Sequence, residues 1–262
     1  MILRRLATAI RRQDWFTVVI EFVIVVTGVL FALQVNNWNE GRLEREREQA
    51  ALNRLQHEFS GILSSAKLRH AEVANYLNNL DIVIQSIARG EIAEEQKLAF
   101  EDGLRWGQIY RSLTGRSAVY IELLSAGNFG LIGDEGLRAA LASYDEQVTK
   151  SETGFLHIRS IQTANALAFI RYFELSPTEF NREWEVAATI ADRGTSYRAL
   201  GTYDFEAMQA DEAFRRAAAQ MREAQAFYFT WHQANVVRAE KVCERLAEAA
   251  HRPCETPHVD TL

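Results

Sequence analysis

The residues with the clearest spacing for metal chemistry are Glu248 and His251, which form a Glu-x-x-His pair near the end of the last predicted helix. A ferritin-like di-iron site needs two such pairs, and two further Glu residues, on the helices of one bundle. No second pair occurs on a predicted helix, because His57, His70, His157 and His232 all lack a Glu three residues earlier. We therefore expect no metal centre.

The two cysteines, Cys243 and Cys254, have no Cys/His surroundings of the kind that activates a nucleophile. In an oxidising compartment they could form a disulfide between the last helix and the tail, and otherwise they would be two free thiols. The chain has no G-x-S-x-G, Walker or dinucleotide-binding motif. We expect no catalytic residue and no cofactor, and a protein that is not an enzyme.

An aromatic cluster in the last helix combines Tyr228, Phe229, Trp231 and His232. Such a group can line a small-ligand pocket between helices, or it can be ordinary core. We interpret this cluster as core.

The composition indicates which elements carry these residues. Of 262 residues, 48% are hydrophobic and 24% charged, with only 3 Pro and 14 Gly. This balance favours an all-α fold over sandwiches and barrels. The net charge of -6 provides no basic surface for nucleic acid, so we expect no nucleic-acid partner.

The strongest element is an apolar run from Trp15 to Trp38, interrupted mainly by Glu21 and Gln34. As a helix it would be roughly 34 Å long. That length fits a hydrocarbon core of about 30 Å, with Trp15 and Trp38 as the anchors at the two interfaces. We predict a transmembrane helix over 15–38 in contact with the lipid bilayer. A buried soluble helix of this length would have a polar face, and a cleaved signal peptide would have a shorter run followed by a small-x-small site.

Four Arg precede the span in a 14-residue head, and four follow it by residue 54, so the basic residues alone do not orient it. A long following domain is translocated largely regardless of its charge. We therefore predict a single-pass protein of the bacterial cytoplasmic (inner) membrane, with its N-terminus in the cytoplasm and its C-terminal domain in the periplasm. Alkaline phosphatase fused after residue 100 should then be active.

Within the span, Glu21, Gly28 and Ala32 fall on one helical stripe. Gly28 and Ala32 form a small-xxx-small pair that allows a second helix to approach closely, and Glu21 would gain from a protein partner in lipid. The stripe could mediate membrane-helix packing, either in a homo-oligomer or against a partner membrane protein. Alternatively, Glu21 could simply reach the headgroups.

The rest of the chain reads as a helical bundle over 39–252, after a basic head (1–14) and the span, and before a disordered tail (253–262). Apolar residues at 52, 55, 59, 62 and 66 have coiled-coil spacing, so the span should continue into a long stalk helix reaching residue 89. Further helices are expected over 94–113, 118–126, 134–148 and 150–174. We also expect a short helix opened by the capping box Ser176–Glu179, a loop over 193–203, and a last helix over 204–251. The last helix is long enough to lie antiparallel to the stalk.

Two motifs resemble a bacterial family of single-span proteins with a domain of unknown function (DUF6090-like). The first motif matches at Glu21, Gly28, Ala32, Leu33, Gln34, Asn36, Asn37, Trp38, Asn39 and Glu40, with Ile20 in place of a Gly. The second matches at Tyr120, Glu122, Leu123, Ser125, Gly127, Asn128, Leu131, Ile132, Leu137 and Arg138, with Ala126 in place of a Ser. The resemblance covers about 55 residues; it implies a membrane anchor and no known activity.

Two functions are compatible with these features. One is a non-enzymatic interaction or scaffold protein with an extracytoplasmic helical domain. The other is a ligand-binding, sensor-like periplasmic bundle that acts through a partner membrane protein. A sensor must pass its signal to an effector, and a head of about 14 residues is too short to be one, so we favour the interaction protein.

Overall fold

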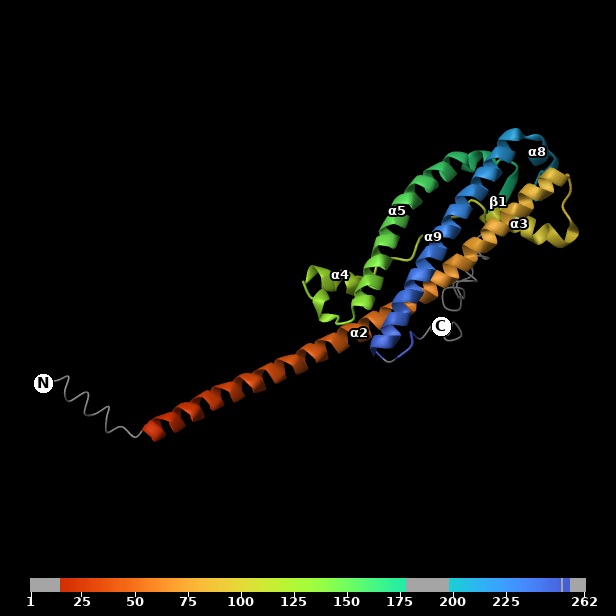
Figure 1. Cartoon of the computed structure of the whole chain (residues 1–262). Helices are drawn as coiled ribbons and strands as arrows, with labels where there is room; N and C mark the ends of the chain where they lie inside the picture. Colours follow the sequence, from red (N-terminus) through yellow and green to blue (C-terminus); the bar gives the residue numbers. More distant parts are fainter. Residues whose placement is uncertain (1–14, 178–197, 251, 255–262) are drawn as a thin grey trace. The chain divides into compact units, whose positions relative to one another are not determined.

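The computed structural model describes residues 15–177, 198–250 and 252–254 of the chain, and its elements are almost all helices (Figure 1). The chain divides into two compact units, one ending at Ala50 and one starting at Ala51. The all-α prediction is confirmed, with the exception of one small hairpin.

Helix α2 (Trp15–Arg89) is 75 residues long and continues through Gly41 and Gly61 without a break. This confirms that the apolar helix continues into a long second segment. The helix ends at Gly90, whose φ of 83° lies in the left-handed region and whose N–H donates to the Ser86 carbonyl at 2.9 Å. A glycine after the last helical residue is a common helix stop, because it takes this conformation without a Cβ clash.

Three long helices build the second unit: α2 from Ala51 onward, α5 (Glu135–Phe169) and α9 (Glu212–Ala250). Ion pairs join Asp81 to Arg222 at 2.9 Å and Lys67 to Glu240 at 2.8 Å. Residues later in α2 thus meet residues earlier in α9, so the two helices are antiparallel, as predicted. Figure 1 shows α9 beside α5 as well.

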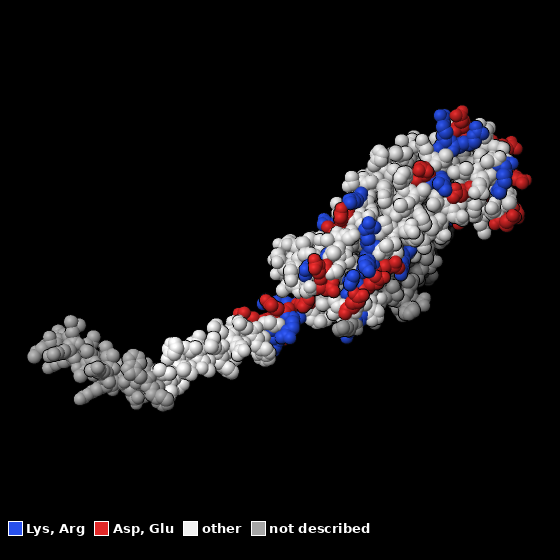
Figure 2. Space-filling model, viewed as in Figure 1, with Lys and Arg blue, Asp and Glu red and all other residues white. Residues whose placement is uncertain are grey.

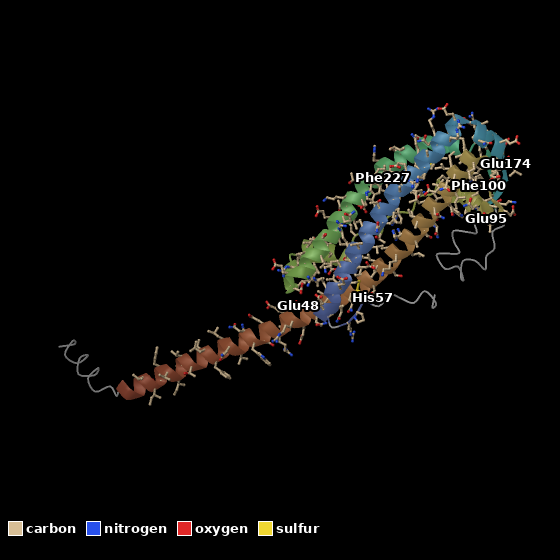
Figure 3. All side chains as sticks on the ribbon, turned by 45° about the vertical axis from the view of Figure 1, so that its right-hand side comes forward. Glu48, His57, Glu95, Phe100, Glu174 and Phe227 are labelled. Carbon is tan, nitrogen blue, oxygen red and sulfur yellow. A yellow bond between two sulfur atoms is a disulfide. The ribbon has the colours of Figure 1, made fainter. Side chains whose placement is uncertain are left out.

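The predicted coiled-coil seam of α2 faces the interior of this bundle. Leu55 and Phe59 are fully buried, Leu52 and Ala66 nearly so, and Ile62 packs against the same cluster. Opposite them lie apolar side chains of α4 (Ala118–Ser125), α5 and α9. At the other end of the bundle a second cluster contains Phe100, whose ring lies 5.6 Å from that of Tyr203 (Figure 3).

The predicted helix–turn–helix is present as α4 (Ala118–Ser125), η2 (Phe129–Leu131) and the start of α5. Gly127 has a φ of 70° and donates to the Leu124 carbonyl, while Asn128 N–H donates to the Leu123 carbonyl. These two bonds are the Schellman pattern for a helix end. The Asp134 side chain accepts from Leu137 N–H and so caps α5, as expected from sequence.

The helix boundaries predicted around residue 175 are wrong. Helix α5 passes through 148–150 unbroken and stops at Phe169, and β1 (Phe173–Pro177) pairs antiparallel with β2 (Arg198–Tyr203). Ser176 and Pro177 therefore lie in a strand and not at a helix start. The residue before proline favours extended backbone both at a helix N-cap and in a strand, so the local sequence allows either, and the pairing with β2 decides for the strand. The remainder of the predicted helix to Asp192 lies outside the described residues.

Two other helices are shorter than predicted. The expected helix over 94–113 consists of η1 (Glu94–Gln96) and α3 (Lys97–Trp106), after which the chain has neither helix nor strand up to Ser117. The last helix is interrupted at Asp211, which separates α8 (Phe205–Ala210) from α9. The Asp211 carboxylate accepts from Ala213 N–H at 2.8 Å and from the Tyr172 hydroxyl at 2.8 Å, so it begins α9 as a capping residue.

Candidate functional site

Among the described residues of its own unit, the apolar stretch of α2 has no packing partner. The part of α2 that begins at Val19 is long and apolar enough to cross a membrane, and its apolar window is not buried at all. Phe22 is 68% exposed and Trp38 67% exposed. Figure 2 shows this stretch uncoloured, with Lys, Arg, Asp and Glu gathered where it ends. An exposed apolar surface of this length needs an apolar environment to cover it.

The predicted packing residues lie on that surface. Glu21 and Ala32 are exposed, and a Cβ placed on Gly28 would meet nothing within 4 Å. The space beside Gly28 is therefore open to another helix. Trp38 is exposed, as an interface anchor would be; the side chain of Trp15, the other predicted anchor, lies outside the described residues.

Residues 36–46 of α2, which lie around and after Trp38, are mostly polar, and their side chains interact with one another. Asn36 Nδ2 donates to Glu40 Oε1 at 2.8 Å, and Arg42 lies 3.7 Å from Glu46. The Arg45 guanidinium donates to the Gly41 carbonyl at 2.9 Å. This abrupt change from apolar to charged residues is typical of the end of a membrane span.

Sequence reasoning missed a segment without helix or strand, residues 107–117, which we call the strap. It connects α3 to α4, and side chains from all three long helices donate to its backbone carbonyls. Gln225 binds the Gly107 and Ile109 carbonyls, Arg69 binds those of Ser112 and Leu113, and Tyr144 binds that of Gly115 at 3.0 Å. These bonds satisfy carbonyls that would otherwise lack a hydrogen-bond partner, because the strap belongs to no helix or sheet.

His232 is part of the same network. It is 1% exposed and its Nε2 lies 3.2 Å from the Arg111 carbonyl, so the ring fixes the middle of the strap. Burial lowers the pKa of His232 to about 4, and the positive charge of Arg69 acts in the same direction. His232 is therefore neutral at pH 7. Its Nε2 must carry the proton to donate to a carbonyl, which leaves Nδ1 as an acceptor.

The aromatic cluster around His232 is core, as we interpreted it from the sequence. Tyr228 is fully buried, its ring centroid lies 5.0 Å from that of Phe155, and burial raises the pKa of its hydroxyl. Phe229 and Trp231 are half-buried and pack against the same cluster. Within the described residues, the side-chain amide of Asn235, one turn further along α9, is fully buried without a hydrogen-bond partner.

A carboxylate–guanidinium pair links Arg111 of the strap to Glu72 of α2. Arg111 Nε lies 2.9 Å from Glu72 Oε2, and the Glu72 side chain is only 15% exposed. Burial raises the pKa of Glu72 and the charge of Arg111 opposes that rise. The pair therefore joins the strap to α2, and its chemistry is that of a structural ion pair.

A second polar site lies where α4 begins. Both carboxylate oxygens of Glu58 accept from this end of the helix: Oε1 from Ala118 N–H at 2.6 Å and Oε2 from the Ser117 hydroxyl. A carboxylate at a helix N-terminus is favourable because the free N–H groups there carry partial positive charge. An open depression of about 440 Å³ beside it is lined by Arg54, His57 and Glu58 among others. Arg54 is already paired with Glu122, so little free chemistry remains there.

The chemical candidates from the sequence are placed as follows. Glu248 pairs with Arg245 at 3.0 Å, and His251 lies outside the described residues. Among the residues that the structure describes, no three His, Cys, Asp or Glu side chains come together as metal ligands. Cys243 and Cys254 are joined as a disulfide, with their Cα atoms 5.5 Å apart.

Comparison with known proteins adds nothing to this geometry. No family model matches the chain, and no curated protein or solved structure matches it either. The resemblance to the DUF6090-like family therefore stays a prediction that rests on the two quoted motifs.

Proposed function

We propose that this chain is a single-pass protein of the bacterial inner membrane that carries a helical bundle on the periplasmic side. In this proposal it works as a non-enzymatic interaction or scaffold protein. The observation that carries it is the exposed apolar stretch of α2 from Val19 to Trp38, followed at once by charged residues. Covering that surface with lipid removes a large apolar area from water, which a soluble protein would achieve by burial.

The disulfide supports the periplasmic side. Disulfides persist in oxidising compartments and are rare in the cytosol. The Cys243–Cys254 pair lies in the second unit, on the C-terminal side of the span. An oxidised pair in cells would therefore agree with a translocated bundle.

Membrane fractionation tests the anchor. The full chain should sediment with membranes and remain there after alkaline carbonate extraction, which strips peripheral proteins. A variant in which Val23, Val26 and Leu30 are replaced by Asp should be released, because each charge in the span costs about 3 kcal/mol or more. Release of the unaltered chain by carbonate would refute the anchor.

The interaction part rests on the stripe of Glu21, Gly28 and Ala32, with open space beside Gly28. Gly28→Leu fills that space and should abolish a crosslinked dimer or the recovery of a partner membrane protein in mild detergent. Val29→Leu, on another face of the same helix, is the matched control and should leave the complex intact. Equal crosslinking in both variants would contradict packing through the stripe.

A sensor-like bundle is the alternative, and one observation favours it. The side-chain amide of Asn235 is fully buried without a partner among the described residues, a situation that a bound polar ligand would relieve. Thermal-shift screening of the purified chain with small polar compounds, repeated on Asn235→Leu, would test this function. Stabilisation of the original chain alone would support the sensor.

A further inference from the structure

The chain after α9 folds back and is held by two different helices. The Cys254 sulfur is bonded to that of Cys243, which lies on α9 at 7% exposure. The Gln56 amide of α2 donates to the carbonyls of Arg252 at 2.6 Å and Pro253 at 2.9 Å. Figure 3 shows the neighbouring His57 on α2, beside this end of α9. We call residues 252–254 the clasp.

The clasp has little else to hold it. Arg252 and Pro253 are exposed, and Cys254 is half-buried against the cluster around Leu52 and Leu55. The free energy gained from a few neutral hydrogen bonds and one partly buried side chain offsets only part of the entropy cost of ordering three residues. The disulfide is therefore the main restraint, and Gln56 is the second.

We propose that the Cys243–Cys254 disulfide is a redox-sensitive fastening, whose reduction by a dithiol releases the clasp while the three-helix bundle stays folded. One thiolate of the dithiol attacks Sγ of Cys254, which is the more exposed of the two cysteines. A mixed disulfide forms and Cys243 leaves as a thiolate that takes a proton from water. The second thiolate of the dithiol then displaces Cys254, which is also protonated. The dithiol ends as a disulfide, and the protein has gained two electrons and two protons.

Selective release follows from where the two cysteines lie. Many bundle contacts of α9 with α2 and α5, such as Arg222–Asp81 and Tyr228–Gln162, occur earlier in the helix and do not involve the clasp. Leu246, which follows Cys243, is fully buried in the core and holds the end of α9 independently of the disulfide. Cys243 itself remains in the last turns of α9, where a buried thiol packs as a small apolar group. This inference concerns the purified chain and does not depend on which side of a membrane the bundle occupies.

Hydrogen–deuterium exchange of the full chain in detergent tests the proposal. Alkylation and mass measurement of the unreduced, denatured protein should first find no free thiol, and two after dithiothreitol. Reduction should then speed amide exchange of the C-terminal peptide that carries the last turn of α9 and the clasp about tenfold or more, because the helical N–H groups of that turn fray once the disulfide is broken, without changing peptides of α5 or of α9 before Val242. Two free thiols before reduction, unchanged exchange in the C-terminal peptide, or faster exchange throughout the bundle would each overturn it.

Two variants separate the restraints. Cys254→Ser cannot form the bond, so its C-terminal peptide should exchange fast with and without dithiothreitol. Gln56→Leu keeps the disulfide and should show exchange between the oxidised and reduced rates of the unaltered chain. A dithiothreitol effect that persists in Cys254→Ser would show that reduction acts elsewhere and would also overturn the proposal.

Discussion

Acidification should destabilise the bundle through His232, because the folded protein keeps this imidazole neutral. Burial lowers its pKa from 6.5 to about 4, Arg69 and His70 act in the same direction, and the hydrogen bond to the Arg111 carbonyl opposes them. Above pH 6.5 the ring is neutral in both the folded and the unfolded chain, so its contribution to stability is fully present. As pH falls, the unfolded chain binds the proton first and stability is lost.

The loss is large enough to measure. Between pH 6.5 and 4 the free energy of unfolding should fall by about 1.4 kcal/mol per pH unit, for a total of about 3 kcal/mol at pH 4. Because the side chain is 1% exposed, solvent screening reduces this value little. The loss should level off once the folded protein also takes up the proton.

The assay is denaturant unfolding of the full chain in detergent at pH 7.5 and pH 4, compared with His232→Gln. The Gln amide can still donate to the Arg111 carbonyl but does not titrate, and the carboxylates affect both proteins equally. The original chain should lose about 3 kcal/mol more than the variant. Equal losses in the two proteins, or an imidazole pKa near 6.5 measured by NMR, would refute the buried neutral His232.

Two further predictions concern packing in the bundle. Gly103→Ala should lower the free energy of unfolding by about 1–3 kcal/mol, because the new Cβ would lie 2.6 Å from the Asn79 carbonyl oxygen of α2. Gly61→Ala, at an open helical position with nothing within 4 Å, should instead raise the free energy of unfolding by up to about 1 kcal/mol. Equal changes in the melting temperatures of the two variants would contradict the close approach of α3 to α2. Asn235→Leu should be neutral or stabilising by about 1 kcal/mol, because it removes an unpaired buried amide. A loss above about 2 kcal/mol would show that the amide is hydrogen-bonded in the folded protein and would contradict its being unpaired.

The sequence predicted best the features that depend on local patterns. The apolar run from Trp15, the seam through Leu55 and Phe59, the helix stop at Gly127 and the Asp134 cap all follow from spacing and from backbone preferences of single residues. In each case, the residues within a few helical turns of the feature are enough to predict it. The confirmed boundaries are those that a single residue sets, at Gly127 and Asp134.

The strap and the hairpin could not be predicted in the same way, because tertiary contacts decide them. Gly107 could mark the end of α3, but little local sequence shows that 108–113 is not helical; its conformation depends on donors from Arg69, Gln225 and His232, which are distant in sequence. The β1–β2 pairing likewise joins segments that start 25 residues apart, at Phe173 and Arg198. A single sequence shows which residues are polar, but not which of them are buried or which carbonyls they bind.

A fusion of alkaline phosphatase to the C-terminus of the full chain tests the periplasmic placement of the bundle most directly, since the enzyme is active only outside the cytoplasm. We predict high activity, and loss of that activity when residues 15–38 are deleted. A cytosolic reporter at the same position should show the reverse. An inactive phosphatase fusion that is expressed at full length in the membrane would contradict a periplasmic bundle.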